Sequence, residues 1–460
     1  MRGTVIIAGT QSGSGKTTLS VGIMAALTAA GLPVQPFKAG PDFIDPAYHA
    51  FITGKPSRNL DGWMMGKKAV RETFARHAPV RGIAVIEGVM GLFDGTGRDG
   101  LEGSTAEVAK LTGAPVVLVV DARSMAGSAA ALVKGFETLD PKINIAGVIL
   151  NRVGSARHEE LLRSAIKRSC GAKVIGAVPR DEGLDIPSRH LGLTTDVAGI
   201  LTKKFVNRLR GMVEKHIDMK ALLNIAAKAP KQAAVPDRPS RKKTAKLAVA
   251  MDEAFCFYYQ DNLDILEAAG LELVPFSPLK DGGLPEGVRG IYLGGGYPEM
   301  YALGLSFNDF VKTDIAQAAG DGVPIYAECG GLMYMTRGIT DKDGVFFQMA
   351  GVLPGQSTML DRRQALGYRE VTPSPANAIF PQGGNARGHE FHYSETVFDK
   401  ARSRHAWLIK KNGDDREYKE GFTAGNVTAS YVHLHFASNA SFARSFAKRV
   451  KEAQAPFKRA

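Results

Sequence analysis

Cysteine is scarce in this sequence, which has only three among its 460 residues. Cys170, Cys256 and Cys329 are far apart, and their number is odd. This usage argues against a disulfide framework and against a zinc site, because both need paired or closely spaced cysteines. We therefore expect at least one cysteine to be kept for its reactivity, and Cys170 and Cys256 to be small apolar fillers.

Long hydrophobic runs are also missing. The longest apolar stretch, residues 114–120 (APVVLVV), is far too short to span a bilayer and is followed by Asp121, so it predicts a buried strand. Residues 1–3 lead directly into a predicted strand, without the charged and apolar leader of an export signal. No repeat of fixed period and no low-complexity tract is present. We expect a cytoplasmic protein without a membrane segment.

Aromatic residues are absent from the most basic part of the chain, residues 228–246. The formal net charge of +12 could attract an anionic partner or could simply keep the surface solvated. A nucleic-acid site would interleave aromatic with basic residues, whereas this segment instead contains prolines. It predicts a linker over residues 228–245, and we expect no nucleic-acid partner.

Before the linker, residues 1–227 alternate short apolar stretches with helical ones, which is typical of a parallel sheet covered by helices on both faces. Ligands bind at the carboxyl ends of the strands in such sheets. The predicted strands are residues 5–8, 34–38, 83–87, 116–121, 145–151 and 174–178.

After the linker the alternation restarts, which predicts a second α/β domain over residues 246–445. Its first strands are expected at residues 247–250, 290–293 and 323–326. Residues 446–460 are expected to form a basic C-terminal tail.

A glycine-rich loop follows the first strand, residues 9–17 (GTQSGSGKT). Strict phosphate loops have four residues between the first glycine and Gly-Lys, whereas five residues separate Gly9 from Gly15, so Gly9 is one residue too far away. Backbone N–H groups can still face phosphate, a lysine can neutralise it and a threonine hydroxyl can bind magnesium. We predict a nucleotide phosphate site, against the alternative of a glycine-rich turn without a ligand. Its residues are Gly13, Gly15, Lys16, Thr17 and Thr18.

Two further loops carry acids, residues 38–46 (KAGPDFIDP) and 85–95 (VIEGVMGLFDG). Glu87 ends a buried strand, where an unpaired carboxylate is costly, so we expect magnesium as its partner. The alternative is a salt bridge to Lys16 or Lys38. For Asp42 and Asp45, a metal ligand and a helix cap are equally good interpretations, so both stay metal candidates alongside Thr17 and Glu87.

Cys329 lies in residues 326–331 (YAECGG), directly after an apolar stretch. A thiol at a tight bend between strand and helix is exposed to substrate, and a helix N-terminus favours the thiolate. Residues 430–436 (SYVHLHF) offer two imidazoles as a base, of which only one can pair with the thiol. N–H groups of Gly295, Gly296 and Gly330 could hold an oxyanion. The alternative is an inert core cysteine, which would leave residues 330–331 without an evident packing purpose.

These motifs resemble the class I glutamine amidotransferases, in which a cysteine attacks the side-chain amide of glutamine and ammonia is released. The resemblance implies Cys329 as nucleophile and His433 as its base. The usual glutamate two residues after the histidine is replaced here by His435. Glu390, in residues 388–394 (GHEFHYS), could substitute for it, or could belong with His392 to a buried polar network between domains.

The N-terminal loop resembles that of dethiobiotin synthetase, which implies ATP as the nucleotide. That enzyme sets an asparagine against adenine after a later strand, and Asn151 in residues 147–152 (GVILNR) matches it. Partition-type ATPases have a lysine where Gln11 stands.

Nearly the whole chain resembles one family, the cobyrinic acid a,c-diamide synthases of cobalamin biosynthesis. The motifs that carry this resemblance are residues 38–46, 58–61 (RNLD), 87–95, 252–259 (DEAFCFYY) and 388–394. It implies a P-loop amidoligase fused to an amidotransferase, which uses ATP, Mg²⁺ and L-glutamine to amidate the a and c acetates of a corrinoid polycarboxylate. An acyl phosphate would form first, and ammonia would then reach it by an enclosed path between the domains.

A substrate rich in carboxylates predicts basic side chains in its pocket, for which Lys38, Arg58 and Arg98 are candidates. Residues 63–65 (WMM) could touch a flat macrocycle or could serve ordinary helix packing. Amidation of hydrogenobyrinic acid or of nickel-sirohydrochlorin uses the same motifs and stays open. An alternative of another class is a regulatory or partitioning ATPase with an inactive amidotransferase module. The assembly state also stays open, with a homodimer among the options.

Overall fold

The computed structural model describes residues 2–97, 100–184, 186, 197–233, 235–236, 238, 242–380, 384–399, 404–454 and 456–459. The chain divides into two compact units, Met1–Asp237 and Arg238–Ala460. Arg98, a candidate substrate contact, lies outside the described residues.

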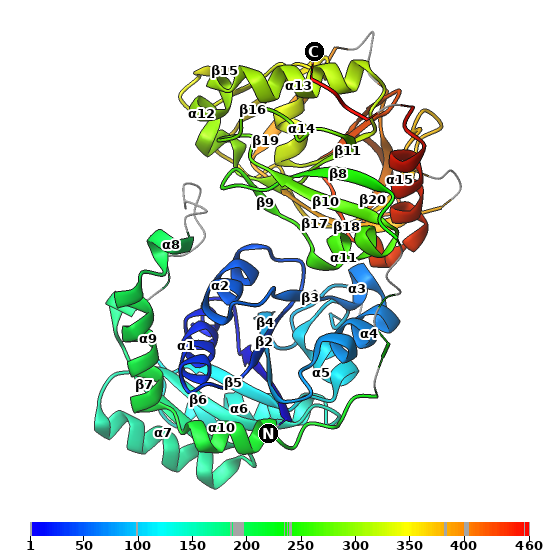
Figure 1. Cartoon of the computed structure of the whole chain (residues 1–460). Coiled ribbons are helices and arrows are strands. Elements are labelled where there is room, and N and C mark those ends of the chain that lie inside the picture. The colour runs from blue at the N-terminus through cyan, green and yellow to red at the C-terminus, as the bar shows by residue number, and fades with distance from the viewer. Residues whose placement is uncertain are drawn as a thin grey trace. The chain divides into compact units, whose positions relative to one another are not determined.

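The first unit is built on a seven-stranded sheet in which all neighbours run parallel (Figure 1). Its buried apolar strands confirm the six predicted from sequence, and a short seventh strand, β3, was not predicted. In sheet order the strands are β3 (Arg58–Leu60), β2 (Val34–Ala39), β4 (Gly82–Gly91), β1 (Arg2–Gly9), β5 (Val116–Asp121), β6 (Ile145–Val153) and β7 (Lys173–Pro179).

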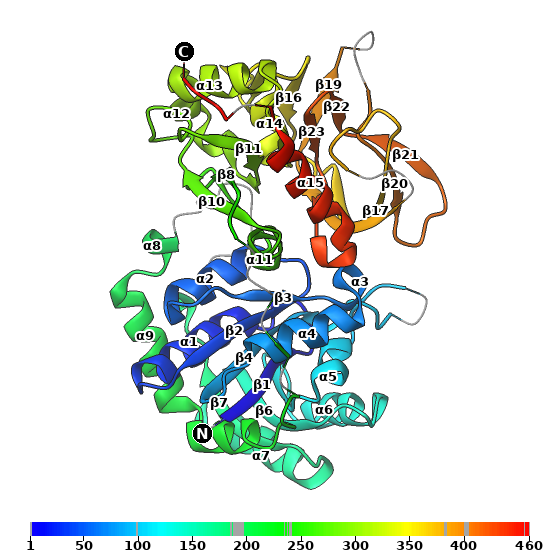
Figure 2. The same cartoon turned by 45° about the vertical axis from the view of Figure 1, so that its right-hand side comes forward.

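Helices cover both faces of this sheet, as predicted (Figures 1 and 2). On one face, α1 and α9 share a buried cluster with the central strands, because Leu19, Ile23 and Val213 pack against residues such as Val5 and Ile7. The helices are α1 (Lys16–Ala29), α2 (Ile44–Thr53), α3 (Gly62–Met65), α4 (Lys67–His77), α5 (Thr105–Thr112), α6 (Ser128–Leu139), α7 (Ala156–Ser169), α8 (Val197–Ile200), α9 (Lys203–His216) and α10 (Met219–Ala226).

The second unit has a central sheet of six strands, of which the first five run parallel and the last is antiparallel. The three strands predicted for this unit are confirmed. The third begins at Ile325, so Val323 and Pro324 of the predicted stretch lie before it. In sheet order the strands are β10 (Leu271–Phe276), β8 (Ala245–Ala250), β11 (Val288–Leu293), β13 (Ile325–Glu328), β23 (Val427–Ser430) and β22 (Phe422–Ala424).

Smaller sheets in the second unit were not predicted from sequence. A five-stranded antiparallel sheet has the order β21 (Glu417–Glu420), β20 (Trp407–Lys411), β17 (Ala365–Pro373), β18 (Ala386–His392), β24 (His433–Leu434). A four-stranded sheet has the order β15 (Phe346–Gln348), β14 (Gly338–Thr340), β16 (Gly355–Met359), β19 (Ser394–Phe398), and β12 (Gly295–Gly296) pairs with β9 (Phe255–Phe257). The helices are α11 (Gln260–Ala268), η2 (Pro298–Tyr301), α12 (Ala302–Phe307), α13 (Asp309–Gly320), α14 (Gly330–Met335), η3 (Phe436–Ser438) and α15 (Ala440–Glu452).

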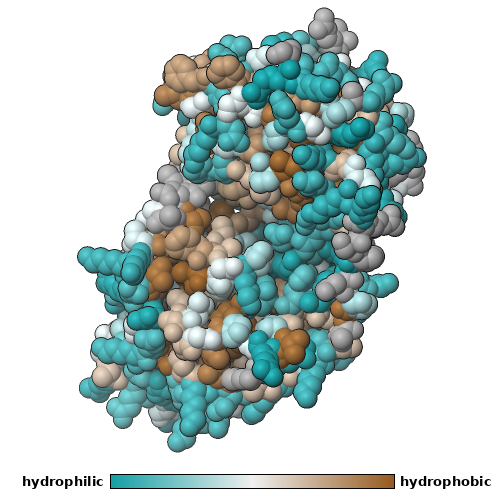
Figure 3. Space-filling view, in the orientation of Figure 1, coloured by the Kyte–Doolittle hydropathy of each residue, from teal (hydrophilic) through white to brown (hydrophobic). Residues whose placement is uncertain are grey.

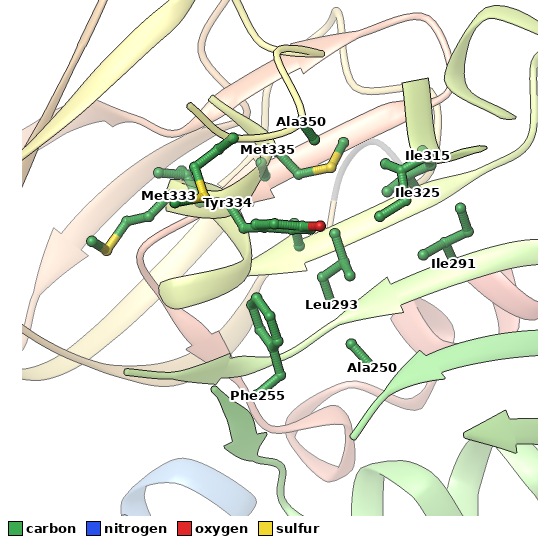
Figure 4. Close-up of a cluster of buried hydrophobic side chains, with 14 of the residues drawn as sticks. Ala250, Phe255, Ile291, Leu293, Ile315, Ile325, Met333, Tyr334, Met335 and Ala350 are labelled. Atoms are coloured by element: carbon green, nitrogen blue, oxygen red, sulfur yellow. The ribbon is translucent and has the colours of Figure 1, made fainter. Parts of the chain in front are cut away.

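Side chains of the central sheet alternate between two buried clusters. Ile325 and Ala327 of β13 belong to one cluster, in which the Tyr334 ring lies beside Leu293 and edge-on to Phe255 (Figure 4). Tyr326 of the same strand belongs to the other. Because strand side chains alternate, Glu328 shares the face of Tyr326.

Residues 446–460 do not form a separate tail. The boundary expected at residue 446 falls inside α15, whose Phe446 and Val450 are fully buried in the second unit's core, and Phe457 is buried as well. An amphipathic helix that buries such an apolar face belongs to the domain on which it packs.

Within the described residues, no helix combines the length and the apolar character needed to cross a membrane. Exposed apolar side chains gather over α12 and the start of α13, namely Leu303, Phe307 and Phe310 (Figure 3).

Candidate active sites of the two units

The predicted phosphate loop joins β1 to α1 in the first unit. Gly13 and Gly15 have φ angles of 74° and 92°, in the left-handed region that favours glycine. A Cβ on Gly15 would lie 2.2 Å from Nδ2 of Asn151, so this position also has no room for a side chain. Lys16 Nζ donates to the Gln11 carbonyl oxygen at 3.2 Å, across the loop. The loop is therefore shaped as a phosphate cradle with a lysine inside it.

Asn151, at the end of β6, contacts this loop directly. Its Nδ2 donates to the Ser14 carbonyl oxygen at 2.9 Å, and Arg152 donates to that of Gly13 at 2.7 Å. Asn151 and Thr18 also line a cavity of about 270 Å³ with the end of β7 and the residues after it, such as Pro179. The structure thus brings together a phosphate loop and an adjoining cavity at the carboxyl ends of the strands.

Glu87 lies fully buried at the centre of a polar cluster beside the loop. Its carboxylate accepts a hydrogen bond from Thr17 Oγ1 at 2.7 Å and from Lys38 Nζ at 2.9 Å, and it lies 2.7 Å from His49 Nε2. Lys38 Nζ also lies 2.5 Å from Asp45 Oδ2. The salt bridge to Lys38, the alternative interpretation of Glu87, is therefore formed.

Asp45 and Glu87 hold the Lys38 ammonium between them, and the Thr17 hydroxyl bonds to Glu87, so the cluster contains the oxygen donors that Mg²⁺ prefers. Asp42 instead accepts from the backbone N–H groups of Ile44 and Asp45 at the start of α2, as a helix cap does. The oxygen donors of the cluster therefore fit a hard cation, and the cluster includes the carboxylate of Asp45 and not that of Asp42.

The expected substrate contacts of the first unit are buried. Lys38 is only 2% exposed and pairs with Glu87 and Asp45, so it belongs to the polar cluster and not to an open substrate surface. Arg58 is 8% exposed on β3. Trp63 and the two methionines after it are buried in α3, which is the helix-packing interpretation.

In the second unit, Cys329 occupies the sharp bend between β13 and α14. Its φ of 49° is one of four positive values at non-glycine residues among those described, and its N–H donates to the Ser430 carbonyl oxygen at 2.7 Å. Such strained conformations concentrate at functional sites. A Cβ on Gly331 would lie 2.4 Å from the Leu293 oxygen, and one on Gly330 would lie 2.7 Å from Pro298. The two glycines are therefore needed for packing, contrary to the sequence-based interpretation.

The thiol itself differs from its expected state. Cys329 is only 6% exposed, and burial raises its pKa, with the field of Glu299 adding to the effect. The short α14 does not overcome this burial, so the expected exposed thiolate is wrong for this structure. A base must therefore take the proton before the sulfur can act as a nucleophile.

His433 lies on β24 and is 3% exposed. A Cβ on Gly295 would lie 2.2 Å from Cε1 of its imidazole, so the ring packs directly on this glycine. The Gly296 nitrogen in turn lies 3.1 Å from where a Cβ on Gly330 would be. The glycine strand β12 thus lies against both the cysteine bend and the imidazole. Burial, followed by the field of His389, lowers the pKa of His433 to about 3, which keeps a neutral base.

His435 is not a second candidate base. Its Nδ1 accepts from the Ala437 N–H at 3.3 Å at the start of η3, and its ring packs on Tyr259 with centroids 4.8 Å apart. It therefore serves as a helix cap and core residue.

Comparison with known proteins covers the chain in two parts and as a whole. Residues 5–194 match the CobQ/CobB/MinD/ParA nucleotide binding domain, and residues 246–441 match the CobB/CobQ-like glutamine amidotransferase domain. A protein of Dehalococcoides mccartyi named cobyrinate a,c-diamide synthase is 46% identical over 97% of this chain and 98% of its own. Proteins of the same name from Priestia megaterium and Salmonella typhimurium are 44% and 42% identical, covering 98% and 94% of this chain and 97% and 95% of their own.

The chain belongs to the cobyrinate a,c-diamide synthase family. A solved structure, PurLQS from Thermotoga maritima, matches 45% of this chain and 97% of its own with a TM-score of 0.33 and 16% identity.

The Glu390 carboxylate pairs with residues other than His433, for which it was the predicted partner. Its carboxylate accepts from Arg369 Nε at 2.5 Å and lies 2.9 Å from His392 Nε2. His392 in turn stacks on Tyr431, with centroids 3.7 Å apart. All four residues lie in the second unit, so the polar network expected as the alternative exists, but within one unit.

Sequence reasoning missed two residues. His49 contacts Glu87, and Glu328 lies with Oε2 3.9 Å from Nδ1 of His433. A carboxylate directly before a nucleophilic cysteine, at the end of a buried strand, was a signal that could have indicated Glu328. Cys256 is exposed and Cys170 is half-buried, so the filler interpretation is wrong for Cys256.

Proposed function

We propose that this protein is an ATP- and glutamine-dependent ligase that converts the a and c acetate carboxylates of cobyrinate into amides. The observation that carries the proposal is the presence of two complete chemistries in one chain. A phosphate loop contacts Asn151 in the first unit, and in the second a strained cysteine bend and the His433 ring both lie against the glycine strand β12. Relatives that span nearly the whole chain carry the corresponding name.

In the first unit, the γ-phosphoryl group of ATP would pass to a substrate carboxylate, giving an acyl phosphate and ADP. A carboxylate resists attack by ammonia until it has such a leaving group. Lys16 and the loop N–H groups would bind phosphate, and Thr18 and Asn151 would contact the nucleotide. Thr17, Asp45 and Glu87 would hold Mg²⁺, which shields phosphate charge when bound.

In the second unit, His433 would take the Cys329 proton as the sulfur attacks the side-chain amide of glutamine. N–H groups of Gly295, Gly296 and Gly330 would stabilise the oxyanion. The proton then leaves with ammonia, and water hydrolyses the thioester to glutamate. Ammonia attacks the acyl phosphate, and phosphate leaves as the amide forms. Because free ammonia is protonated at neutral pH, we propose that it is transferred without equilibrating with bulk solution. We also propose that the reaction takes place in the cytoplasm, where ATP and glutamine are supplied.

The test replaces the nucleophile. Cys329→Ser should abolish glutamine-dependent amidation, by ~10³-fold or more, but retain amidation from ammonium salts at raised pH. Product amides and ADP would be quantified with cobyrinate, hydrogenobyrinic acid and nickel-sirohydrochlorin side by side. Loss of both nitrogen sources would contradict the division of labour. Nucleotide hydrolysis without amide formation from any macrocycle would favour a regulatory ATPase instead.

A further inference from the structure

The orientation of the catalytic histidine is not explained by the residues that carry the family resemblance. A histidine base needs a group at its second ring nitrogen, which fixes the tautomer and stabilises the imidazolium that forms. The position two residues after His433 is occupied by His435, which caps η3 and packs on Tyr259. The orienting group must therefore come from another part of the fold.

Three carboxylates lie near the segment that carries His433, of which Glu328 and Glu390 are buried and Glu420 is half-buried, and their contacts differ. Glu390 is occupied by Arg369 and His392. Glu420 accepts from Ser430 Oγ and from the Tyr431 N–H, both at 2.7 Å. Glu328 lies with Oε2 3.9 Å from Nδ1 of His433, while its Oε1 accepts from the Leu434 N–H at 3.0 Å. Glu328 alone of these three forms an ion-pair contact with the His433 ring among the described residues.

We propose that Glu328 is the positioning residue of the cysteine–histidine pair, which holds Nδ1–H of His433 toward its carboxylate and so leaves Nε2 to accept the Cys329 proton. This inference rests on the proposed glutamine hydrolysis and deepens it. The proton moves from Sγ to Nε2, the Nδ1 proton stays, and the resulting imidazolium faces the carboxylate. Nε2 later returns the proton to the departing ammonia.

The surroundings of Glu328 suit this role. Its other contacts are neutral donors, Tyr292 OH at 2.9 Å and Tyr326 OH at 2.7 Å, and no Lys or Arg among the described residues pairs with it. A carboxylate that is 1% exposed and lacks a cationic partner has its charge available for an adjacent imidazolium. Burial raises the pKa of Glu328 to about 7, which agrees with a carboxylate that has only neutral donors.

Covalent labelling of Cys329 tests the inference without requiring turnover. A diazoketone analogue of glutamine alkylates the nucleophile at a rate that depends on removal of the thiol proton. Glu328→Gln should lower both this rate and kcat for glutamine hydrolysis by ~10²-fold, because the imidazole loses its anionic partner, while KM for glutamine changes by less than about threefold.

Glu420→Gln is the matched control, since Glu420 is a half-buried carboxylate that also accepts from a backbone N–H of the same segment. It should label and hydrolyse within about threefold of wild type, because it does not contact the ring. Both variants should keep ammonium-dependent amidation, which reports an intact fold. Equal losses in the two variants, or wild-type labelling in Glu328→Gln, would overturn the inference. Wild-type protein that hydrolyses no glutamine would instead refute the proposed function.

Discussion

Glu87 and Glu328 make an instructive pair, because each is a fully or almost fully buried glutamate near the carboxyl end of a parallel strand. Glu87 contacts the Lys38 ammonium, the His49 imidazole and the Thr17 hydroxyl. Glu328 contacts two tyrosine hydroxyls, a backbone N–H and the edge of His433. Both glutamates therefore lie near the end of a parallel strand, but Glu87 has a cationic partner, whereas Glu328 has neutral donors.

The partners decide what each carboxylate can do. A carboxylate that lies beside an ammonium and a hydroxyl suits phosphate and metal chemistry, where oxygen donors and fixed charges are needed. One that has only neutral donors keeps its negative charge for a partner that becomes positive during the reaction, as an imidazole base does, and burial raises its pKa. Fold position places a side chain at the ligand edge of the sheet, and the neighbours set its chemistry.

The largest effect is expected from Glu87→Gln. Loss of this charge should reduce amidation with both glutamine and ammonium by ~10³-fold or more, since the phosphate chemistry serves both nitrogen sources. ADP and amide formation would be measured together. Diazoketone labelling of Cys329 should stay at the wild-type rate, and Glu160→Gln, on the exposed face of α7, should leave all activities unchanged. A variant that loses only the glutamine-dependent reaction would contradict the contrast between the two glutamates.

A smaller effect, confined to the second unit, is expected from Gly295→Ala. The new Cβ would lie 2.2 Å from Cε1 of His433, so the buried ring must move. Glutamine hydrolysis should fall by about 10- to 50-fold, as expected for a misplaced catalytic group, while ammonium-dependent amidation persists.

Gly320→Ala is the control for that change. A Cβ there meets nothing within 4 Å, and alanine suits its place at the end of α13 better than glycine does. Unchanged glutamine hydrolysis in Gly295→Ala would show that the ring tolerates a shift and would weaken the case for a precise His433 geometry.

The smallest effect concerns pH. If Glu328 acts ionised, kcat/KM for glutamine hydrolysis should fall as pH drops below about 7, the pKa to which burial raises this group. The sign follows because protonation removes the acceptor for Nδ1–H. Groups facing the pair are Tyr292 and Tyr326 at Glu328, and His389, His392 and Glu390 at His433.

Glu299 must be separated from Glu328 in this profile, because burial raises its pKa to about 7 as well and its field acts on Cys329. Rates would be compared from about pH 5.5 to 8.5. The acid limb should persist in Glu299→Gln and flatten in Glu328→Gln. The reverse result would assign the acid limb of the profile to Glu299. It would then remove the functional difference proposed between Glu87 and Glu328.

Much of the fold could be predicted from sequence, because parallel strands buried on both faces give continuous apolar runs. Residues 116–121 are one example, and the loop before Lys16 carries glycines at positions 13 and 15, where the backbone has the positive φ that favours glycine. The antiparallel strands of the second unit, such as β17 and β18, are half-exposed and lack such runs, so they were missed.

Site residues divide in the same way. Cys329 and His433 lie in motifs that carry their chemistry in the local sequence, and the structure places the cysteine bend and the imidazole against the same glycine strand, β12. Whether Lys38 would face substrate or Glu87, and whether the thiol would be ionised, depended on neighbours brought by distant segments and on burial. The position of Glu328 directly before the cysteine is visible in the local sequence. Its place beside His433 is not, because that contact depends on side-chain alternation in β13 and on β24, whose His433 lies 105 positions further along the chain.

The adjacency of Glu328 and Cys329 has a practical consequence for how such chains are classified. The acidic residue and the nucleophile are neighbours in sequence, so only the base comes from a distant segment of the chain. A sequence search that requires an acidic residue just after the histidine would classify the amidotransferase unit of this chain as inactive. Inspecting the residue that precedes the sulfur would retain it.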